Sequence, residues 1–172
     1  MEFPPIPSWE AAHPLVVHFP IALLLVVPLF AVAGLLRWEA GRGFRLTALI
    51  LMALGTFAAA LAVSSGEAAE TFARGASGTS RVMHEHESQA LSARVYFVLL
   101  TVSYALLLAV EKRRPDRFRP PVRFGLFGIH LALYLVACLA LANTAHLGGR
   151  LVHEFGVRAV EPNAIASPES GR

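Results

Sequence analysis

The 172-residue sequence contains little charge and almost no cysteine. Only 16% of its residues are Asp, Glu, Lys or Arg, whereas soluble domains average about 25%. The single cysteine, Cys138, lies inside an apolar segment, which excludes an intrachain disulfide and a C-x-x-C-H haem attachment. The sequence also lacks a P-loop, a G-x-S-x-G motif and a dinucleotide fingerprint. These absences argue against a soluble enzyme, and we do not expect the chain to be an enzyme by itself.

Long hydrophobic segments take the place of the missing charge. Hydrophobic residues make up 55% of the chain, and four segments approach the roughly 20 apolar residues that a membrane-spanning helix requires. Backbone groups in lipid must pair internally, so these segments are expected to be helices. The predicted spans are 14–36, 46–65, 88–110 and 123–145. The predicted fold is all-α: an integral membrane four-helix up-down bundle over residues 1–157, followed by a mobile C-terminal tail at 158–172.

The basic residues indicate an orientation. Segments 37–45 and 111–123 together carry nine Lys/Arg, whereas the N-terminal segment, the long central connection and the C-terminal tail carry five. The positive-inside rule therefore places the two short connections in the cytoplasm and both termini on the periplasmic side. This predicts a multi-pass protein of the bacterial inner (cytoplasmic) membrane with two antiparallel hairpins. The basic loops are short and face anionic lipid, so we expect contact with the bilayer and no nucleic-acid partner.

The histidines are the most informative polar residues. Six of the seven fall at one end of the predicted spans, the periplasmic end, and come from three distant parts of the sequence. They are His13, His18, His84, His86, His146 and His153. Clustered histidines from several helices favour a shared metal or cofactor site. The seventh, His130, lies in the inner part of the fourth span, where we expect a hydrogen-bonded packing residue or a contact with another subunit.

The spacing of these histidines ranks them as ligands. On a helix, His84 and His86 point to different sides, and we favour His86 because it lies nearer the apolar segment. His146 and His153 are seven apart and share a face, with Gly148 and Gly149 between them. These glycines either let a ligand approach closely or end the helix. The predicted cofactor-binding residues are His13, His18, His86, His146 and Arg150, with His84 and His153 as weaker candidates.

The motifs HPLVVHFPIALLL at 13–25, HEHESQA at 84–90 and HLGGRLVHEFGV at 146–157 resemble an uncharacterised family of bacterial four-helix membrane proteins. This domain-of-unknown-function family is recognised by an HPxxVHFP start and an LGGxLV end. Its members sometimes occur beside cytochrome-like domains. The family ending more often reads like YxHGV after LGGxLV, so the aromatic residue and His153 are displaced here. The resemblance implies the four-helix membrane fold and leaves the function open.

The first functional hypothesis is a b-type haem electron-transfer subunit of a larger respiratory or redox complex. Non-covalent haem needs one or two axial histidines held by helices that leave room for the macrocycle. We expect one haem rather than two, because the inner depth offers only His130. The favoured axial pair is His18 with His86, and the alternative pair is His13 with His146. Arg81, Arg94 or Arg150 would then pair with the propionates.

Two other hypotheses remain open. Imidazole ligands also suit a directly bound copper, zinc or iron ion. Glu10 precedes His13 with the ExxH spacing seen in di-iron bundles, but the second and fourth apolar segments carry no carboxylate, which favours a single-ion site over a di-iron site. Alternatively, the chain is a non-catalytic structural membrane subunit. Under each hypothesis the small extramembrane mass predicts partners, such as other membrane or periplasmic redox subunits, including cytochromes.

Overall fold

The computed structural model describes residues 7–37, 40–73 and 78–157, and these residues form helices and turns with no strand. The helices are α1 (His13–Val16), α2 (His18–Leu36), α3 (Arg42–Ala73), α4 (Ser80–Arg113) and α5 (Pro120–His153), with a 3-10 turn, η1 (Pro115–Arg117), between the last two. These helices form four spans, each long and apolar enough to cross a membrane. The prediction of an all-α four-helix membrane bundle is confirmed. The predicted tail at 158–172 lies outside the described residues.

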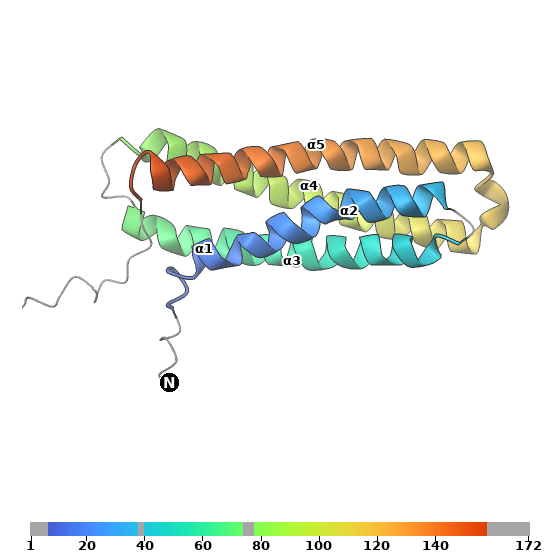
Figure 1. Cartoon of the computed structure of the whole chain (residues 1–172), viewed down its shortest axis with the longest axis horizontal. Coiled ribbons are helices and arrows are strands. Elements are labelled where there is room, and N and C mark those ends of the chain that lie inside the picture. Colours follow the sequence, from blue (N-terminus) through green and yellow to red (C-terminus); the bar gives the residue numbers. More distant parts are fainter. Residues whose placement is uncertain (1–6, 38–39, 74–77, 158–172) are drawn as a thin grey trace, which may run out of the picture.

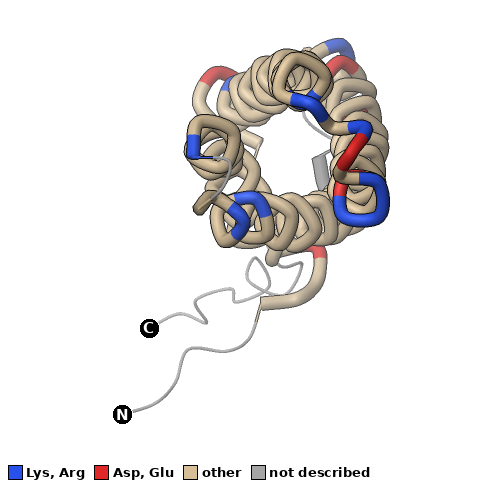
Figure 2. The backbone as a smooth tube through the Cα atoms, turned by 90° about the vertical axis from the view of Figure 1, so that its right-hand side faces the viewer, with Lys and Arg blue, Asp and Glu red and all other residues tan. Residues whose placement is uncertain are grey.

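The spans run alternately up and down, and two hairpins build the bundle (Figure 1). α2 packs along α3, and α4 packs along α5, as the two short connections predict. The end of the bundle at which these connections lie faces the viewer in Figure 2, and Lys and Arg positions are gathered there. We call this the basic end. The opposite end, which holds the start of α1 and the end of α5, is called the histidine end.

The first span is interrupted near its start. α1 ends at Val16 and α2 begins at His18, with Val17 between them. Pro20 explains the break, because a proline has no backbone N–H to bond the carbonyl four residues earlier, that of Val16. Pro28, by contrast, lies inside α2 without ending it.

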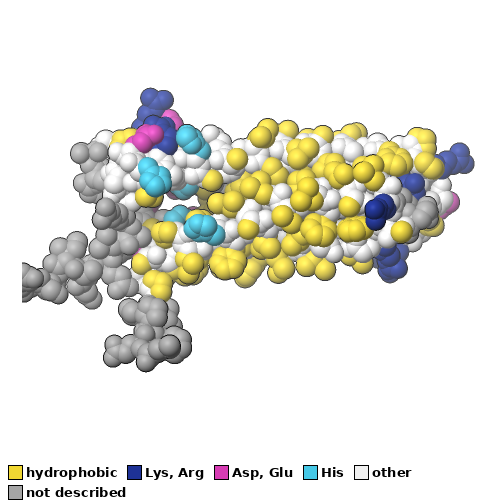
Figure 3. All heavy atoms as spheres, in the orientation of Figure 1, with side chains coloured by type: hydrophobic (Ala, Val, Ile, Leu, Met, Phe, Trp, Pro, Cys, Tyr) yellow, Lys and Arg dark blue, Asp and Glu magenta, His cyan; other side chains and the backbone are white. Residues whose placement is uncertain are grey.

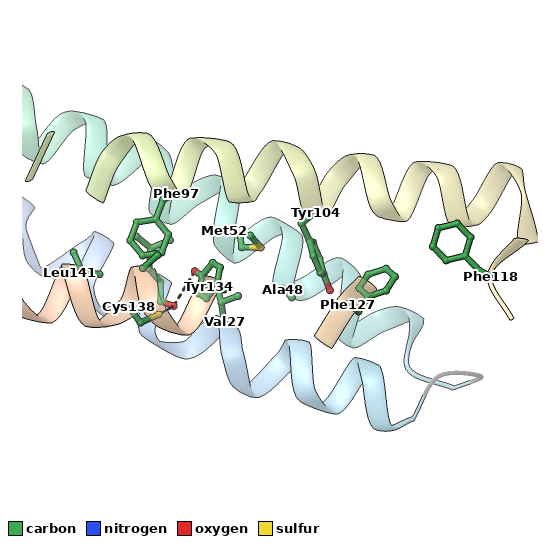
Figure 4. Packing of buried hydrophobic residues seen from close by; sticks show 12 residues of the cluster. Val27, Ala48, Met52, Phe97, Tyr104, Phe118, Phe127, Tyr134, Cys138 and Leu141 are labelled. Atoms are coloured by element: carbon green, nitrogen blue, oxygen red, sulfur yellow. Dashed lines mark hydrogen bonds between the residues drawn. The ribbon is translucent and has the colours of Figure 1, made fainter. Parts of the chain in front are cut away.

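The core lies in the middle of the bundle and consists of interlocking aromatic and aliphatic side chains (Figure 4). The rings of Phe97 and Tyr134 meet edge to face at 5.4 Å, and those of Tyr104 and Phe127 at 5.7 Å. The Tyr134 hydroxyl donates a hydrogen bond to the Leu24 carbonyl at 3.1 Å, which ties α5 to α2. This packing closes the bundle interior below the histidine end.

The outer surface of the middle of the bundle is apolar (Figure 3). Large hydrophobic side chains are exposed there, including Leu29 at 69% and Leu139 at 71%. In water such a surface would be unfavourable, but in a bilayer these side chains contact lipid tails.

The helices are longer than the hydrophobic segments that predicted them. α3, α4 and α5 continue beyond the predicted span limits at the histidine end, to Ala73, Ser80 and His153. The extension of α3, residues 66–73, is rich in Ala and Glu, which are strong helix formers. The predicted span limits place His84 and His86 before the helix, but both residues lie within α4.

Candidate cofactor site

A cavity of about 230 Å³ lies at the histidine end, between all four spans. The space-filling view shows a hollow in this end of the bundle with histidine side chains around it (Figure 3). The volume is about a quarter smaller than the roughly 300 Å³ at which small-molecule sites typically begin. Its walls are mostly apolar, and the polar or glycine residues that line it include His13, Gly66, Glu67, Glu70, His86, Glu87, Arg94, Thr144 and Gly148.

His13 enters the cavity from α1, and its ring is held by α3. Its Nδ1 lies 3.0 Å from the hydroxyl oxygen of Ser65, which is fully buried. Ser65 donates its own hydroxyl proton to the Ala62 carbonyl at 3.0 Å. The Ser65 oxygen must therefore accept, so Nδ1 of His13 carries the proton. The lone pair of the neutral ring is then on Nε2.

His86 enters the same cavity from α4, and its ring is held by α5. Its Nδ1 lies 2.9 Å from the carbonyl oxygen of Thr144. A carbonyl only accepts, so Nδ1 of His86 donates and Nε2 carries the lone pair. The hydrogen bonds to Ser65 and Thr144 are both made by Nδ1, and the His13 ring also interacts with the Ala62 backbone, to which Ser65 donates. Two imidazoles from different helices thus line one cavity, each in the tautomer that leaves Nε2 free to act as a ligand.

A glycine on the neighbouring helix makes room for each ring. A Cβ added at Gly66 would lie 3.0 Å from Cε1 of His13, and one at Gly148 would lie 3.1 Å from Cε1 of His86. Both distances are tighter than ordinary contacts, so a larger residue would displace the rings. Gly148 does not end the helix, because α5 continues to His153. Of the two roles considered for this glycine, close approach is the one seen, and the group that approaches is an imidazole.

The other predicted ligands lie elsewhere. His18, His84, His146 and His153 are exposed, and none of them lines the cavity. The structure therefore brings His86 together with His13 rather than with His18, and it leaves His146 outside. His18 follows His13 by five residues, which on helical backbone turns it about 140° away.

The three arginines considered as anion partners also differ in position. Arg150 binds Glu154 four residues later, with a 2.9 Å ion pair, and this hydrogen bonding lowers the pKa of the Glu154 carboxyl. Arg81 forms an equivalent pair with Glu85 and is 88% exposed. Neither Arg81 nor Arg150 lines the cavity, whereas Arg94 does.

His130 lies in the core, away from the cavity. It is 7% exposed, and its Nε2 donates to the Leu100 carbonyl at 3.0 Å. Its ring packs against Tyr104 at 5.1 Å. The prediction of a hydrogen-bonded packing residue is confirmed.

Sequence reasoning missed the residues that orient the two rings. Ser65 and Thr144 contact the histidines through a hydroxyl and a backbone carbonyl. A backbone carbonyl cannot be identified from the sequence as a histidine partner, because every residue has one. A buried serine one residue before a helical glycine, as in Ser65–Gly66, is a weak signal that only the position of His13 makes meaningful.

Taken together, these features define a small four-helix membrane protein with a two-histidine cavity at one end. A family model described as "Predicted membrane protein (DUF2231)" matches residues 10–161. The chain belongs to this family, in agreement with the resemblance of its histidine and glycine motifs. No curated protein and no solved structure matches the chain.

Proposed function

We propose that this protein binds one b-type haem in the cavity at the histidine end, with His13 and His86 as axial ligands. The observation that carries the proposal is the pair of imidazoles from α1 and α4. The Nδ1 of each ring is hydrogen-bonded to a buried oxygen, that of the Ser65 hydroxyl or of the Thr144 carbonyl. Ligating histidines in metalloproteins are held in this way, because the second hydrogen bond fixes both the tautomer and the ring orientation. The apolar walls suit a hydrophobic macrocycle.

The number of available ligands favours haem over a bare metal ion. Zinc sites, for example, use three or four protein ligands. Within residues 7–37, 40–73 and 78–157, no group of three or more His, Cys, Asp or Glu side chains is placed to hold a metal ion. Two histidines are too few for such a site, but they are sufficient when a porphyrin supplies four more nitrogens.

A bis-histidine haem supplies one-electron transfer and leaves the iron no open position for a substrate. We therefore propose an electron-transfer role within a larger redox complex, with the chemistry carried out by a partner. His13 and His86 hold the iron, while Ser65 and Thr144 orient them. Because of the excess of Lys/Arg at the basic end, we propose by the positive-inside rule that this end faces the cytoplasm. A haem bound in the cavity would then exchange electrons with membrane or periplasmic redox subunits in a bacterial inner membrane.

The test is an optical spectrum of the purified protein before and after reduction, with the haem content measured chemically. We expect a Soret band, sharp α and β bands on reduction, and one haem per chain. Carbon monoxide added to the reduced protein should change the spectrum little, because both axial positions are filled. A colourless protein would refute the proposal. A large shift with carbon monoxide would refute bis-histidine ligation.

A further inference from the structure

Arg94 is the only Lys or Arg among the described residues that line the cavity. It lies on α4, eight residues from His86 toward the membrane centre, which corresponds to about 12 Å along the helix. No other described residue forms a hydrogen bond or an ion pair with it. Arginine within a spanning helix is unfavourable unless its charge is compensated, so its position on a cavity wall points to an anionic group in that cavity.

The carboxylates that line the cavity lie farther from the membrane centre than Arg94 does. Glu67 directly follows Gly66, which supports the His13 ring, and Glu70 is one turn farther toward the histidine end. Glu87 is adjacent to His86. The glutamates thus lie at the depth of the two histidines or farther toward the histidine end. Arg94 lies nearer the membrane centre. An anionic group in the cavity would be repelled by the glutamates and attracted to Arg94.

We infer that Arg94 binds a carboxylate of the cavity's occupant, and that this carboxylate points toward the membrane side of the histidine pair. The inference rests on the proposed function, since the propionates of haem are the carboxylates in question. A guanidinium binds a carboxylate through two parallel hydrogen bonds, which gives both strength and orientation. Arg94 therefore fixes which edge of the macrocycle faces into the membrane.

The experiment compares haemin with haemin dimethyl ester, in which both carboxylates are neutral. Full-length protein made in cells without haem is titrated with each porphyrin in detergent, and binding is followed at the Soret band. The wild type should bind haemin about 10- to 100-fold more tightly than the ester, the range expected for a hydrogen bond to a charged group. Arg94→Gln should bind both equally, and Arg94→Lys should recover part of the preference. Arg81→Gln, whose side chain is outside the cavity, should behave as the wild type does.

The alternative source of the anion is a lipid phosphate, so the protein is also assayed for bound phosphatidylglycerol. Equal affinity of the wild type for both porphyrins would overturn the role of Arg94 without any variant being needed. Phosphatidylglycerol that is retained by the wild type and lost in Arg94→Gln would overturn it as well, by assigning the residue to lipid. If the wild type binds neither porphyrin, the proposed haem function itself is wrong, and the inference is overturned with it.

Discussion

The carbonyl oxygen of Thr144 lies 2.9 Å from Nδ1 of His86, and this contact links α5 to α4 across 58 residues of sequence. Gly148, one turn farther along α5, lies against the same His86 ring. One helix thus fixes both the tautomer and the position of a histidine that belongs to another. The geometry of the candidate site depends on how α5 packs against α4, and several consequences can be measured.

Replacing either cavity histidine should remove the cofactor. His13→Ala and His86→Ala are each expected to lose most of the bound haem, because one axial ligand disappears. His18→Ala and His146→Ala are the matched controls, since both side chains are exposed at the same end and do not line the cavity. Haem content and the Soret band of the purified variants provide the measurement. Equal losses in all four variants would contradict the assignment of the pair.

Gly148→Ala should weaken cofactor binding through a steric effect. The added Cβ would lie 3.1 Å from Cε1 of His86 and would displace the ring. Overpacking of this kind costs about 1–3 kcal/mol, so we expect affinity for haemin to fall about tenfold. Gly149→Ala is an internal control, because a Cβ at that position meets nothing within 4 Å. That variant should bind haemin normally and be slightly more stable, since alanine favours helix over glycine. Similar binding by both variants would argue against a tight His86–Gly148 contact.

Ser65→Ala removes the hydroxyl that accepts the proton of His13 Nδ1. The net value of one such hydrogen bond is about 0.5–1.5 kcal/mol, which predicts a 2- to 10-fold lower affinity for haemin. Ser64→Ala changes an exposed neighbour on the same helix and should have no effect. Titration of both variants with haemin measures the difference. Wild-type affinity in Ser65→Ala would mean that this hydroxyl does not orient the ligand.

His130→Ala separates packing from ligation. The substitution removes a buried ring and leaves the Leu100 carbonyl without its donor. We expect a loss of about 2 kcal/mol in stability, seen as a lower melting temperature in detergent, with one haem still bound. Loss of haem at normal thermal stability would make His130 a ligand and would overturn its assignment to the core.

The orientation of the bundle can be tested with reporter fusions. Fusions after Arg117, at the basic end, and after His153, at the histidine end, should report opposite sides of the membrane. From the excess of Lys/Arg we expect the Arg117 fusion to be in the cytoplasm. The reversed result would place the cavity on the cytoplasmic side, and its redox partners with it.

The sequence predicted the spans, the hairpins and the end of the bundle that holds most of the histidines, because hydrophobic length and loop charge are local properties. It did not predict the pairing of His13 with His86. Pairing depends on the rotation of each helix about its axis, and the uniformly apolar spans leave that rotation undetermined. His18 was favoured as a ligand because its depth matched, yet depth says nothing about which way a side chain points. The sequence pattern identified Gly148 as important, but the ring that it accommodates became evident only from the fold.

The continuation of α3, α4 and α5 beyond the apolar segments has an electrical consequence. α4 has 34 residues and is about 51 Å long, whereas the hydrocarbon layer is about 30 Å thick. His86 lies in the part of α4 that extends beyond the predicted span toward one surface, so most of the membrane's voltage drop lies on its other side. An electron that reached His86 from that same surface would cross little of this voltage. The transfer would therefore neither charge nor discharge the membrane, and its rate should be insensitive to an imposed membrane potential.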